Sequence, residues 1–271
     1  MKEFQLADRI ISTENPAFIM AIVNATPDSF YSKSRGGIDH ALKLIDEGAD
    51  ILDIGGESTR PGSSYVDEKE EIERVVSVIK AVRKVSGIPI SVDTRKKSVM
   101  EAAYDAGADV LNDVSALEDD SAMAEFCAAK KIPVILMHKR GIPENMQLET
   151  SYGNVFDEVS SYLEERAQYA VDSGIDGKKI IVDPGIGFGK NLEGNCSLIK
   201  NCGKLCGGKY PVLMALSRKS CIGQMTGRET DGRLYGTLAA DLISVMNGAF
   251  MVRVHDCAPC LDTFAVLKSL M

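Results

Sequence analysis

Two carboxylates and one amide in this sequence, Asp93, Asn112 and Asp183, are candidates for a hydrogen-bonding wall. Each of them follows a short run of apolar residues. Carboxylate oxygens accept hydrogen bonds, and an amide both donates and accepts, so the three groups could hold a flat heterocycle with amino and ring N–H donors. Asp and Asn also favour helix caps and turns, which is the alternative for any one of them. Their occurrence after three different runs favours a shared site.

A second set of side chains would bring positive charge to the same region. Its members are Arg60, Lys219, Arg253 and His255. Arginine binds phosphate oxygens through paired hydrogen bonds, and lysine binds them as a point charge. Solvated surface charge is the usual alternative, but Arg60 and Lys219 lie among small or rigid neighbours and not along an exposed helix. The set therefore predicts binding of an anionic group.

The elements that must position these residues follow a regular alternation. Eight apolar runs, separated by helix-length segments, read as strands of β-α units. The runs are residues 19–23, 51–54, 88–92, 110–111, 134–137, 180–182, 212–216 and 250–252. Eight such units fit a single closed (β/α)₈ barrel, or TIM barrel, over residues 1–271, with the active site at the carboxyl ends of the strands. Every candidate residue falls at such an end.

Helices are clearest in four segments. They are residues 67–86, 95–106, 154–173 and 231–247. Thr94 is a candidate N-cap for the second of these helices. Two connections, 25–37 and 55–65, are long and polar for a barrel, and they follow the first and second strands. Long loops with glycine and serine at the catalytic face predict mobile lids.

One glycine-rich run, 183–190, looks like a phosphate cradle, although its glycine spacing is not that of a P-loop. His138 ends the fifth predicted strand. Its position is equally compatible with lining the site and with a structural hydrogen bond. His40 falls at a predicted helix start and is interpreted as a surface residue.

Composition argues against several classes of protein. A formal charge of −8 argues against nonspecific nucleic-acid binding, which needs a basic face. No apolar stretch approaches the roughly 18–20 residues of a membrane helix, and residues 1–9 do not form a secretory signal.

The seven cysteines are scattered and odd in number, which indicates reduced thiols in a cytoplasmic protein. Two pairs of cysteines, at 202 and 206 and at 257 and 260, could suggest zinc. The order of the units places these pairs at opposite ends of the barrel, so we expect no cysteine metal site.

Eight motifs follow the eight runs in order. They are NATPDSF at 24–30, DIGGESTRPG at 53–62, SVDT at 91–94, NDV at 112–114, MH at 137–138, DPGIGFGK at 183–190, SRKS at 217–220 and RVHD at 253–256. In this order they resemble the motifs of the dihydropteroate synthase family over nearly the whole chain. Each motif is moderately specific, and together they are highly specific.

The resemblance implies an enzyme of folate biosynthesis. Such an enzyme joins 6-hydroxymethyl-7,8-dihydropterin diphosphate to 4-aminobenzoate and releases diphosphate and 7,8-dihydropteroate. The family also implies a homodimer and a magnesium ion bound with the diphosphate. The small-molecule substrates are then the expected partners, with no nucleic acid and no membrane.

The resemblance also implies a role for each matching residue. The pterin would be held by Asp93, Asn112, Asp183 and Lys219. The diphosphate would be held by Thr59, Arg253 and His255, and magnesium by Asn24. The aminobenzoate slot would be formed by Arg60, Pro61, Phe188 and Ser220. Departure of diphosphate requires neutralisation of its growing charge, which Mg²⁺, Arg253 and His255 could supply, while Asp93 could stabilise the cationic pterin methylene. The expected catalytic residues are thus Asp93, Lys219, Arg253 and His255.

Two positions depart from the family pattern. Ala21 stands where family members usually have glycine. The first loop carries Lys33 and Arg35 where the family usually has an Asp and then glycines, which puts its closure geometry in doubt.

Three rival functions differ in chemistry. Methyltetrahydrofolate:corrinoid methyltransferases share the pterin pocket, but the motifs STRPG and SRKS argue against them. A class I aldolase would use Lys219 as a Schiff-base amine and would need an apolar pocket. A non-catalytic pterin-binding protein would bind pterin without turnover.

Overall fold

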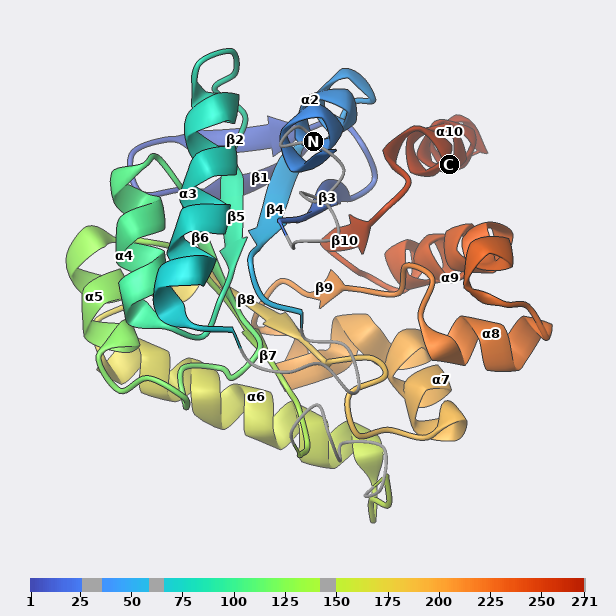
Figure 1. Cartoon of the computed structure of the whole chain (residues 1–271). Coiled ribbons are helices and arrows are strands. Elements are labelled where there is room, and N and C mark those ends of the chain that lie inside the picture. Colours follow the sequence, from blue (N-terminus) through green and yellow to red (C-terminus); the bar gives the residue numbers. More distant parts are fainter. Residues whose placement is uncertain (26–35, 59–65, 142–149, 271) are drawn as a thin grey trace.

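A closed barrel of parallel strands forms the centre of the protein, whose computed structural model describes residues 1–25, 36–58, 66–141 and 150–270 (Figure 1). The sheet has eight strands in the order β8-β7-β6-β5-β4-β3-β10-β9. Its strands are β3 (Phe18–Asn24), β4 (Ile51–Gly55), β5 (Ile90–Asp93), β6 (Val110–Asp113), β7 (Val134–Met137), β8 (Ile180–Asp183), β9 (Leu213–Met214) and β10 (Met251–Val254). A parallel bridge between Val182 and Val212 joins the two edges. The predicted (β/α)₈ barrel is confirmed.

Helices follow the strands and surround the sheet (Figure 1). They are α2 (Gly36–Asp46), α3 (Glu68–Arg83), α4 (Lys97–Asp105), α5 (Met123–Lys130), α6 (Val155–Asp172), α7 (Leu192–Asn201), α8 (Ser220–Thr226), α9 (Leu234–Met246) and α10 (Cys257–Leu270), with 3₁₀ turns η1 (Gly177–Lys179), η2 (Cys202–Gly208) and η3 (Thr230–Arg233). Side chains of Asp67 and Asn154 cap α3 and α6 by accepting backbone N–H groups. The predicted helix 231–247 is divided between η3 and α9.

Thr94 is not the N-cap of α4, contrary to the prediction. The helix begins at Lys97, whose amide donates to Asp120 Oδ2 at 2.8 Å. Thr94 instead donates its hydroxyl to Glu71 Oε1 at 2.7 Å. A carboxylate from a neighbouring loop therefore performs the capping that sequence-local reasoning assigned to Thr94.

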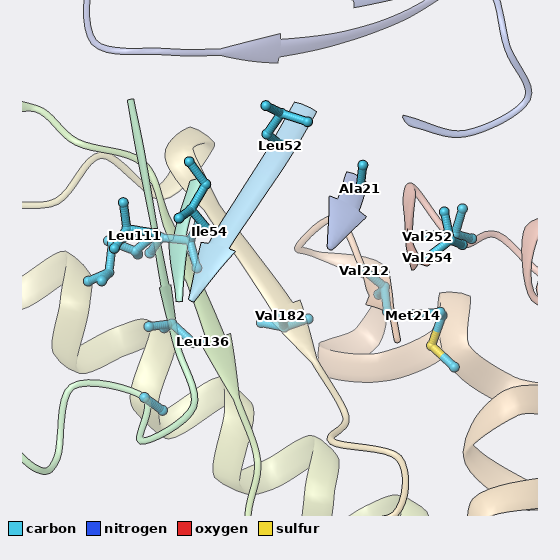
Figure 2. Packing of buried hydrophobic residues seen from close by; sticks show 14 of the residues in the cluster. Ala21, Leu52, Ile54, Leu111, Leu136, Val182, Val212, Met214, Val252 and Val254 are labelled. Carbon is cyan, nitrogen blue, oxygen red and sulfur yellow. The ribbon is translucent and has the colours of Figure 1, made fainter. Parts of the chain in front are cut away.

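Alternation along the strands separates two apolar layers. Ala21, Leu52 and Val252 belong to the layer between barrel and helices, which Figure 2 shows together with residues of the other strands. Phe18 and Met20 belong to the second layer, inside the barrel, with Ile51, Val110, Ile135, Ile181, Leu213 and Met251. Both faces of each strand are buried, as is usual in a parallel sheet covered by helices.

An N-terminal hairpin, which the sequence did not predict, closes the end of the barrel where the strands begin. Its antiparallel strands are β1 (Lys2–Gln5) and β2 (Ile10–Thr13). The hairpin places Phe4 and Leu6 in the same interior cluster as Phe18. The Phe4 ring also lies 6.3 Å from the Phe250 ring, edge to face. Apolar contact therefore seals this end.

Most strand ends differ from the predicted runs by a few residues. The strand β5 begins at Ile90 and not at residue 88, because Pro89 has no N–H to donate to the ladder. Most of each predicted lid, residues 26–35 and 59–65, lies outside the described residues. None of the described helices is long and apolar enough to cross a membrane.

Candidate active site

The alternation that fills the barrel with apolar side chains continues into a polar layer at the carboxyl ends of the strands. Four strands carry a polar residue two positions after an inward apolar one. The pairs are Ile51 and Asp53, Val110 and Asn112, Ile181 and Asp183, and Met251 and Arg253. Because side chains two apart share a face of a strand, these polar groups point into the barrel mouth. Asp93 reaches the same place from the end of β5.

Arg253 lies between two carboxylates in this layer. Its Nε donates to Asp53 Oδ2 at 2.5 Å, and its Nη2 donates to Asp93 Oδ2 at 2.9 Å. Asn112 donates to the same Asp53 oxygen at 3.2 Å. The structure thus brings Asp93, Asn112 and Arg253 together, as expected from the sequence.

Asp53 belongs to the candidate site although it was not selected from the sequence. It is fully buried and contacts both Arg253 and Asn112. The signal was present, since Asp53 interrupts an apolar strand at an inward position, two residues after Ile51. A charge in a buried strand is costly unless it has partners or a ligand.

Several buried oxygens of this layer have no hydrogen-bond partner among the described residues. They are Asp53 Oδ1, Ser91 Oγ and Asp93 Oδ1. Burial raises the pKa of the Asp93 carboxyl to about 7, while Arg253 acts to lower it and Asp53 adds to the rise. Buried acceptors without donors are costly, so they favour a ligand that brings N–H groups.

Asp183 and Lys219 form the opposite part of the mouth. Asp183 Oδ1 accepts the Gly185 amide at 2.7 Å, and burial raises the pKa of this carboxyl. Lys219 Nζ donates to Ile186 O at 2.6 Å and lies 4.9 Å from the centre of the Phe188 ring. Burial lowers the pKa of Lys219 to about 8, while Asp183 acts to raise it.

His255 is held by the loop after β9. Its backbone N–H donates to Ser217 Oγ at 3.1 Å, and its Nδ1 lies 2.9 Å from the same hydroxyl. In the next pair along both loops, Arg218 donates Nε and Nη2 to the two oxygens of Asp256, each at 2.9 Å. Two side-by-side links therefore fix the loop carrying Lys219 against the loop carrying His255.

The remaining predicted residues lie farther out or outside the described part. Asn24 is exposed at the end of β3, and Ser220 is exposed at the start of α8. Thr59, Arg60 and Pro61 lie outside the described residues.

The glycine-rich run 183–190 is not arranged as a phosphate cradle. The amides of Gly185, Gly187 and Phe188 donate to Asp183, to Asn195 and to the Gly185 carbonyl. Lys190 is buried beneath the loop and contacts His138. His138 thus has a structural hydrogen bond, which was one of its two readings.

The described residues contain no group of three or more His, Cys, Asp or Glu that could hold a metal ion. All seven cysteines are free. Cys202 lies in η2, before β9, whereas Cys257 begins α10, after β10, so the two cysteine pairs flank different ends of the strands.

Comparison with known proteins shows the family of this chain. The family model described as pterin binding enzyme matches residues 20–255. The curated dihydropteroate synthase of Haemophilus influenzae is 42% identical over 256 residues, 93% of either chain. That of Neisseria meningitidis serogroup C is 44% identical over 262 residues, 93% of this chain and 92% of the relative.

Solved structures of dihydropteroate synthases are also similar to this chain. Dihydropteroate synthase of Xanthomonas albilineans with 4-aminobenzoic acid has a TM-score of 0.92 at 40% identity, covering 99% of this chain and 97% of that chain. The Yersinia pestis enzyme in a sulfonamide drug complex has a TM-score of 0.93 at 34% identity, covering 99% of both chains. The chain therefore belongs to the pterin-binding enzyme family and, within it, to the dihydropteroate synthases.

Proposed function

We propose that this protein condenses 6-hydroxymethyl-7,8-dihydropterin diphosphate with 4-aminobenzoate, giving 7,8-dihydropteroate and diphosphate. The observation that carries the proposal is the set of buried carboxylates at the barrel mouth, two of which have an oxygen without a donor among the described residues. Such acceptors match the amino and ring N–H groups of a pterin. Related structures from Xanthomonas albilineans hold 4-aminobenzoic acid or 7,8-dihydropteroate.

In the reaction, the aminobenzoate nitrogen forms a bond to the pterin methylene carbon while the carbon–oxygen bond to diphosphate breaks. The electron pair of that bond leaves with the diphosphate, and the amine proton passes to water or to the diphosphate. Asp93 would stabilise the positive charge that develops on the pterin methylene, and Arg253 and His255 would stabilise the departing anion. Lys219 and Asp183 would hold the pterin ring between them.

Magnesium would be held by the side-chain oxygen of Asn24. This residue is exposed at the end of β3, beside the mouth, and an amide oxygen is a ligand type that Mg²⁺ accepts. One protein ligand suffices if the diphosphate supplies others, which fits the lack of a cluster of acidic ligands in the described part. The ion would supply charge neutralisation for the leaving group. Chelation should suppress turnover, and Asn24→Ala should raise the magnesium concentration needed for half-maximal rate.

Rival functions are less well supported. A Schiff-base aldolase needs an unprotonated lysine in an apolar pocket, whereas Lys219 donates to a backbone carbonyl and faces Asp183, which favours the ammonium form. The related synthases at about 40% identity favour the proposed reaction over methyl transfer to a corrinoid.

A diphosphate-release assay with and without 4-aminobenzoate tests the proposal. We expect release with the pterin diphosphate and Mg²⁺ only when 4-aminobenzoate is present. Pterin binding without release would identify a non-catalytic binding protein. Consumption of methyltetrahydrofolate with a corrinoid acceptor would identify a methyltransferase.

A homodimer is part of the same proposal. Exposed apolar side chains gather on neighbouring helices, with Tyr235 (82% exposed), Ile243 and Met246 (68% exposed) on α9 and Val266 on α10. An apolar patch of this kind is typical of a surface that a partner covers. Light scattering after size exclusion should give twice the mass of the chain, and Met246→Glu should reduce it. Seven free thiols support the proposed cytoplasmic location.

A further inference from the structure

One lysine beside the site is buried and has no carboxylate of the described residues in direct contact. Lys190 is 3% exposed, and its Nζ lies 2.9 Å from each of three neutral acceptors: His138 Nδ1, Gly185 O and Phe188 O. An ammonium has three hydrogens, so it satisfies all three acceptors at once. Burial of the cation is costly and lowers the pKa of Lys190 to about 7, while Asp183 acts to raise it, and the three acceptors offset part of that cost.

His138 is the fixed end of this arrangement. Its side chain is buried at the end of β7, and burial together with Lys190 lowers the pKa of its imidazole to about 3. In the neutral ring, Nδ1 can accept a hydrogen bond from Lys190 Nζ when the hydrogen is on Nε2. His138 contacts the Tyr162 ring edge to face, at 4.9 Å between centres, which sets the ring plane.

Lys190 connects the loop 184–191 to His138 through hydrogen bonds. The loop runs so close to the end of β7 that a side chain at Gly185 would collide with the His138 carbonyl, and one at Gly189 would lie 2.8 Å from Arg140 O. Both glycines also have φ of +65°, which other residues rarely adopt. The path of the loop therefore depends on these glycines and on Lys190, which donates hydrogen bonds to the carbonyls of Gly185 and Phe188.

The same loop sets the surroundings of Lys219. Lys190 binds the carbonyls of Gly185 and Phe188, and Ile186 lies between these two residues. The Ile186 carbonyl accepts a hydrogen bond from Lys219 Nζ at 2.6 Å. Phe188, one of those two, presents its ring to the same ammonium at 4.9 Å. A shift of the loop would move the acceptor and the ring together, and Lys219 with them.

We propose that Lys190, held by His138, is a positioning residue for the pterin-binding wall, fixing the loop 184–191 so that Ile186 and Phe188 hold Lys219 in place. It touches neither substrate and acts through Lys219. The inference rests on the proposed function, because it assumes that the mouth binds a pterin.

The test compares variants that differ at this contact. Lys190→Met keeps an unbranched side chain only one atom shorter than lysine and removes its donors. His138→Leu removes the acceptor, whereas His138→Asn keeps an acceptor near the position of Nδ1. Lys179→Met is the matched control, because Lys179 is also buried (6% exposed) and donates to a backbone carbonyl, Lys131 O at 2.9 Å, but lies before β8 at the other end of the barrel.

Calorimetry with 6-hydroxymethyl-7,8-dihydropterin, without aminobenzoate, provides the direct readout, and thermal unfolding is measured beside it. We expect Lys190→Met and His138→Leu to weaken pterin binding about 10–100-fold, the size of effect that a misplaced binding group produces. His138→Asn and Lys179→Met should bind pterin within a few-fold of the unchanged protein. The KM for pterin diphosphate should rise in parallel in the first two variants.

Each outcome has a distinct meaning. Unchanged pterin affinity in folded Lys190→Met would overturn the inference, as would an equal loss in Lys179→Met, since the effect would then be one of general stability. If Lys190→Met does not fold, His138→Leu against His138→Asn decides, and equal pterin affinity in those two overturns it. No pterin binding by the unchanged protein would instead refute the proposed function.

Discussion

The two ends of the barrel give a carboxylate different surroundings. Asp109, at the end where the strands begin, has both oxygens paired, Oδ1 with Arg9 at 2.9 Å and Oδ2 with Arg83 at 2.7 Å. Asp93, at the carboxyl end, has one oxygen on Arg253, while its other oxygen has no partner among the described residues. At the first end, the paired oxygens of Asp109 contribute to stability. At the second end, the unpaired oxygen of Asp93 can accept a hydrogen bond from a ligand.

The same contrast extends to the neighbourhoods of these acids. Phe4 and Leu6 from the hairpin fill the first end with apolar contact. At the carboxyl end, Asp53, Asn112, Asp183 and Arg253 take the inward positions of their strands instead. Buried oxygens without a donor cost stability, and Asp53 and Asp93 each have one such oxygen among the described residues. The carboxyl end therefore gives up stability for binding capacity.

The largest expected effect is on the carboxyl end. Asp183→Ala should weaken pterin binding about 10–150-fold, because a charge-assisted hydrogen bond to a heterocycle N–H contributes about 1.5–3 kcal/mol. Calorimetry with the folded variant measures this loss, and Asp183→Asn, which keeps one acceptor, should lose less. Unchanged affinity in Asp183→Ala would remove this residue from the pterin-binding wall.

At the opposite end, Arg83→Ala should show the reverse pattern. Arg83 donates to Asp109 and to the carbonyls of Gly107 and Ile88, so its loss should lower the free energy of unfolding by about 1–3 kcal/mol. Pterin affinity should remain as it was. The control is Lys43→Ala, since the exposed Lys43 pairs with Glu47 one helical turn away and its loss should change stability little. Weaker pterin binding in folded Arg83→Ala would show that the end of the barrel where the strands begin also contributes to binding.

A smaller effect should appear in the pH dependence of stability. Asp93 has a pKa of about 7 in the folded chain, against 3.8 as its ordinary value, so the folded state holds a proton between these pH values that the unfolded state has lost. Its contribution to stability is therefore greatest below pH 4, falls as the pH rises to about 7 and is constant above. Asp93→Asn should remove this fall, so it should gain stability relative to the unchanged protein between pH 5 and pH 8.

Urea unfolding at pH 5 and pH 8 measures the difference. The same variant should lose pterin binding, because the amide cannot supply the negative charge. If Asp93→Asn gains no more free energy of unfolding at pH 8 than at pH 5, Asp93 is ionised in the folded protein throughout this range.

The sequence predicted the barrel and the polar layer for one physical reason. Eight apolar runs separated by helix-length segments indicate parallel strands, and residues that follow such runs, among them Asp93, Asn112 and Asp183, share the carboxyl end of the barrel. The hairpin β1–β2 escaped prediction because each strand has only four residues and its apolar side chains pack against distant strands. Thr94 was misjudged because Asp120, remote from the helix start in sequence, supplies the cap.

Asp53 and Lys190 were missed for related reasons. Asp53 was treated as part of a motif and not as an inward position of β4. Lys190 was placed in a phosphate cradle because glycine-rich runs before a helix often bind phosphate. Only the three-dimensional contacts of the loop show that the amides of Gly185, Gly187 and Phe188 donate within the protein and that Lys190 is buried.

The smallest effect concerns Pro61, which lies outside the described residues and whose role stays a prediction. Proline fixes its own φ near −65° and restricts the residue before it, so it presets the shape of the loop that carries Arg60. Pro61→Ser should cost about 0.4–1 kcal/mol through chain entropy, raising the KM for aminobenzoate roughly two- to fivefold. Steady-state kinetics with both substrates provide the check. A rise in the KM for pterin diphosphate alone would reassign the loop.

The central claim is that the carboxyl end of this barrel joins a pterin to an aromatic amine. The most direct measurement is mass spectrometry of the products formed from pterin diphosphate and isotopically labelled 4-aminobenzoate, beside the diphosphate released. We expect labelled 7,8-dihydropteroate in a one-to-one ratio with diphosphate, formed much more slowly by Asp183→Ala at limiting pterin diphosphate and at the unchanged rate by Arg83→Ala. Diphosphate release without labelled product, or labelled product that persists at full rate in Asp183→Ala, would contradict it.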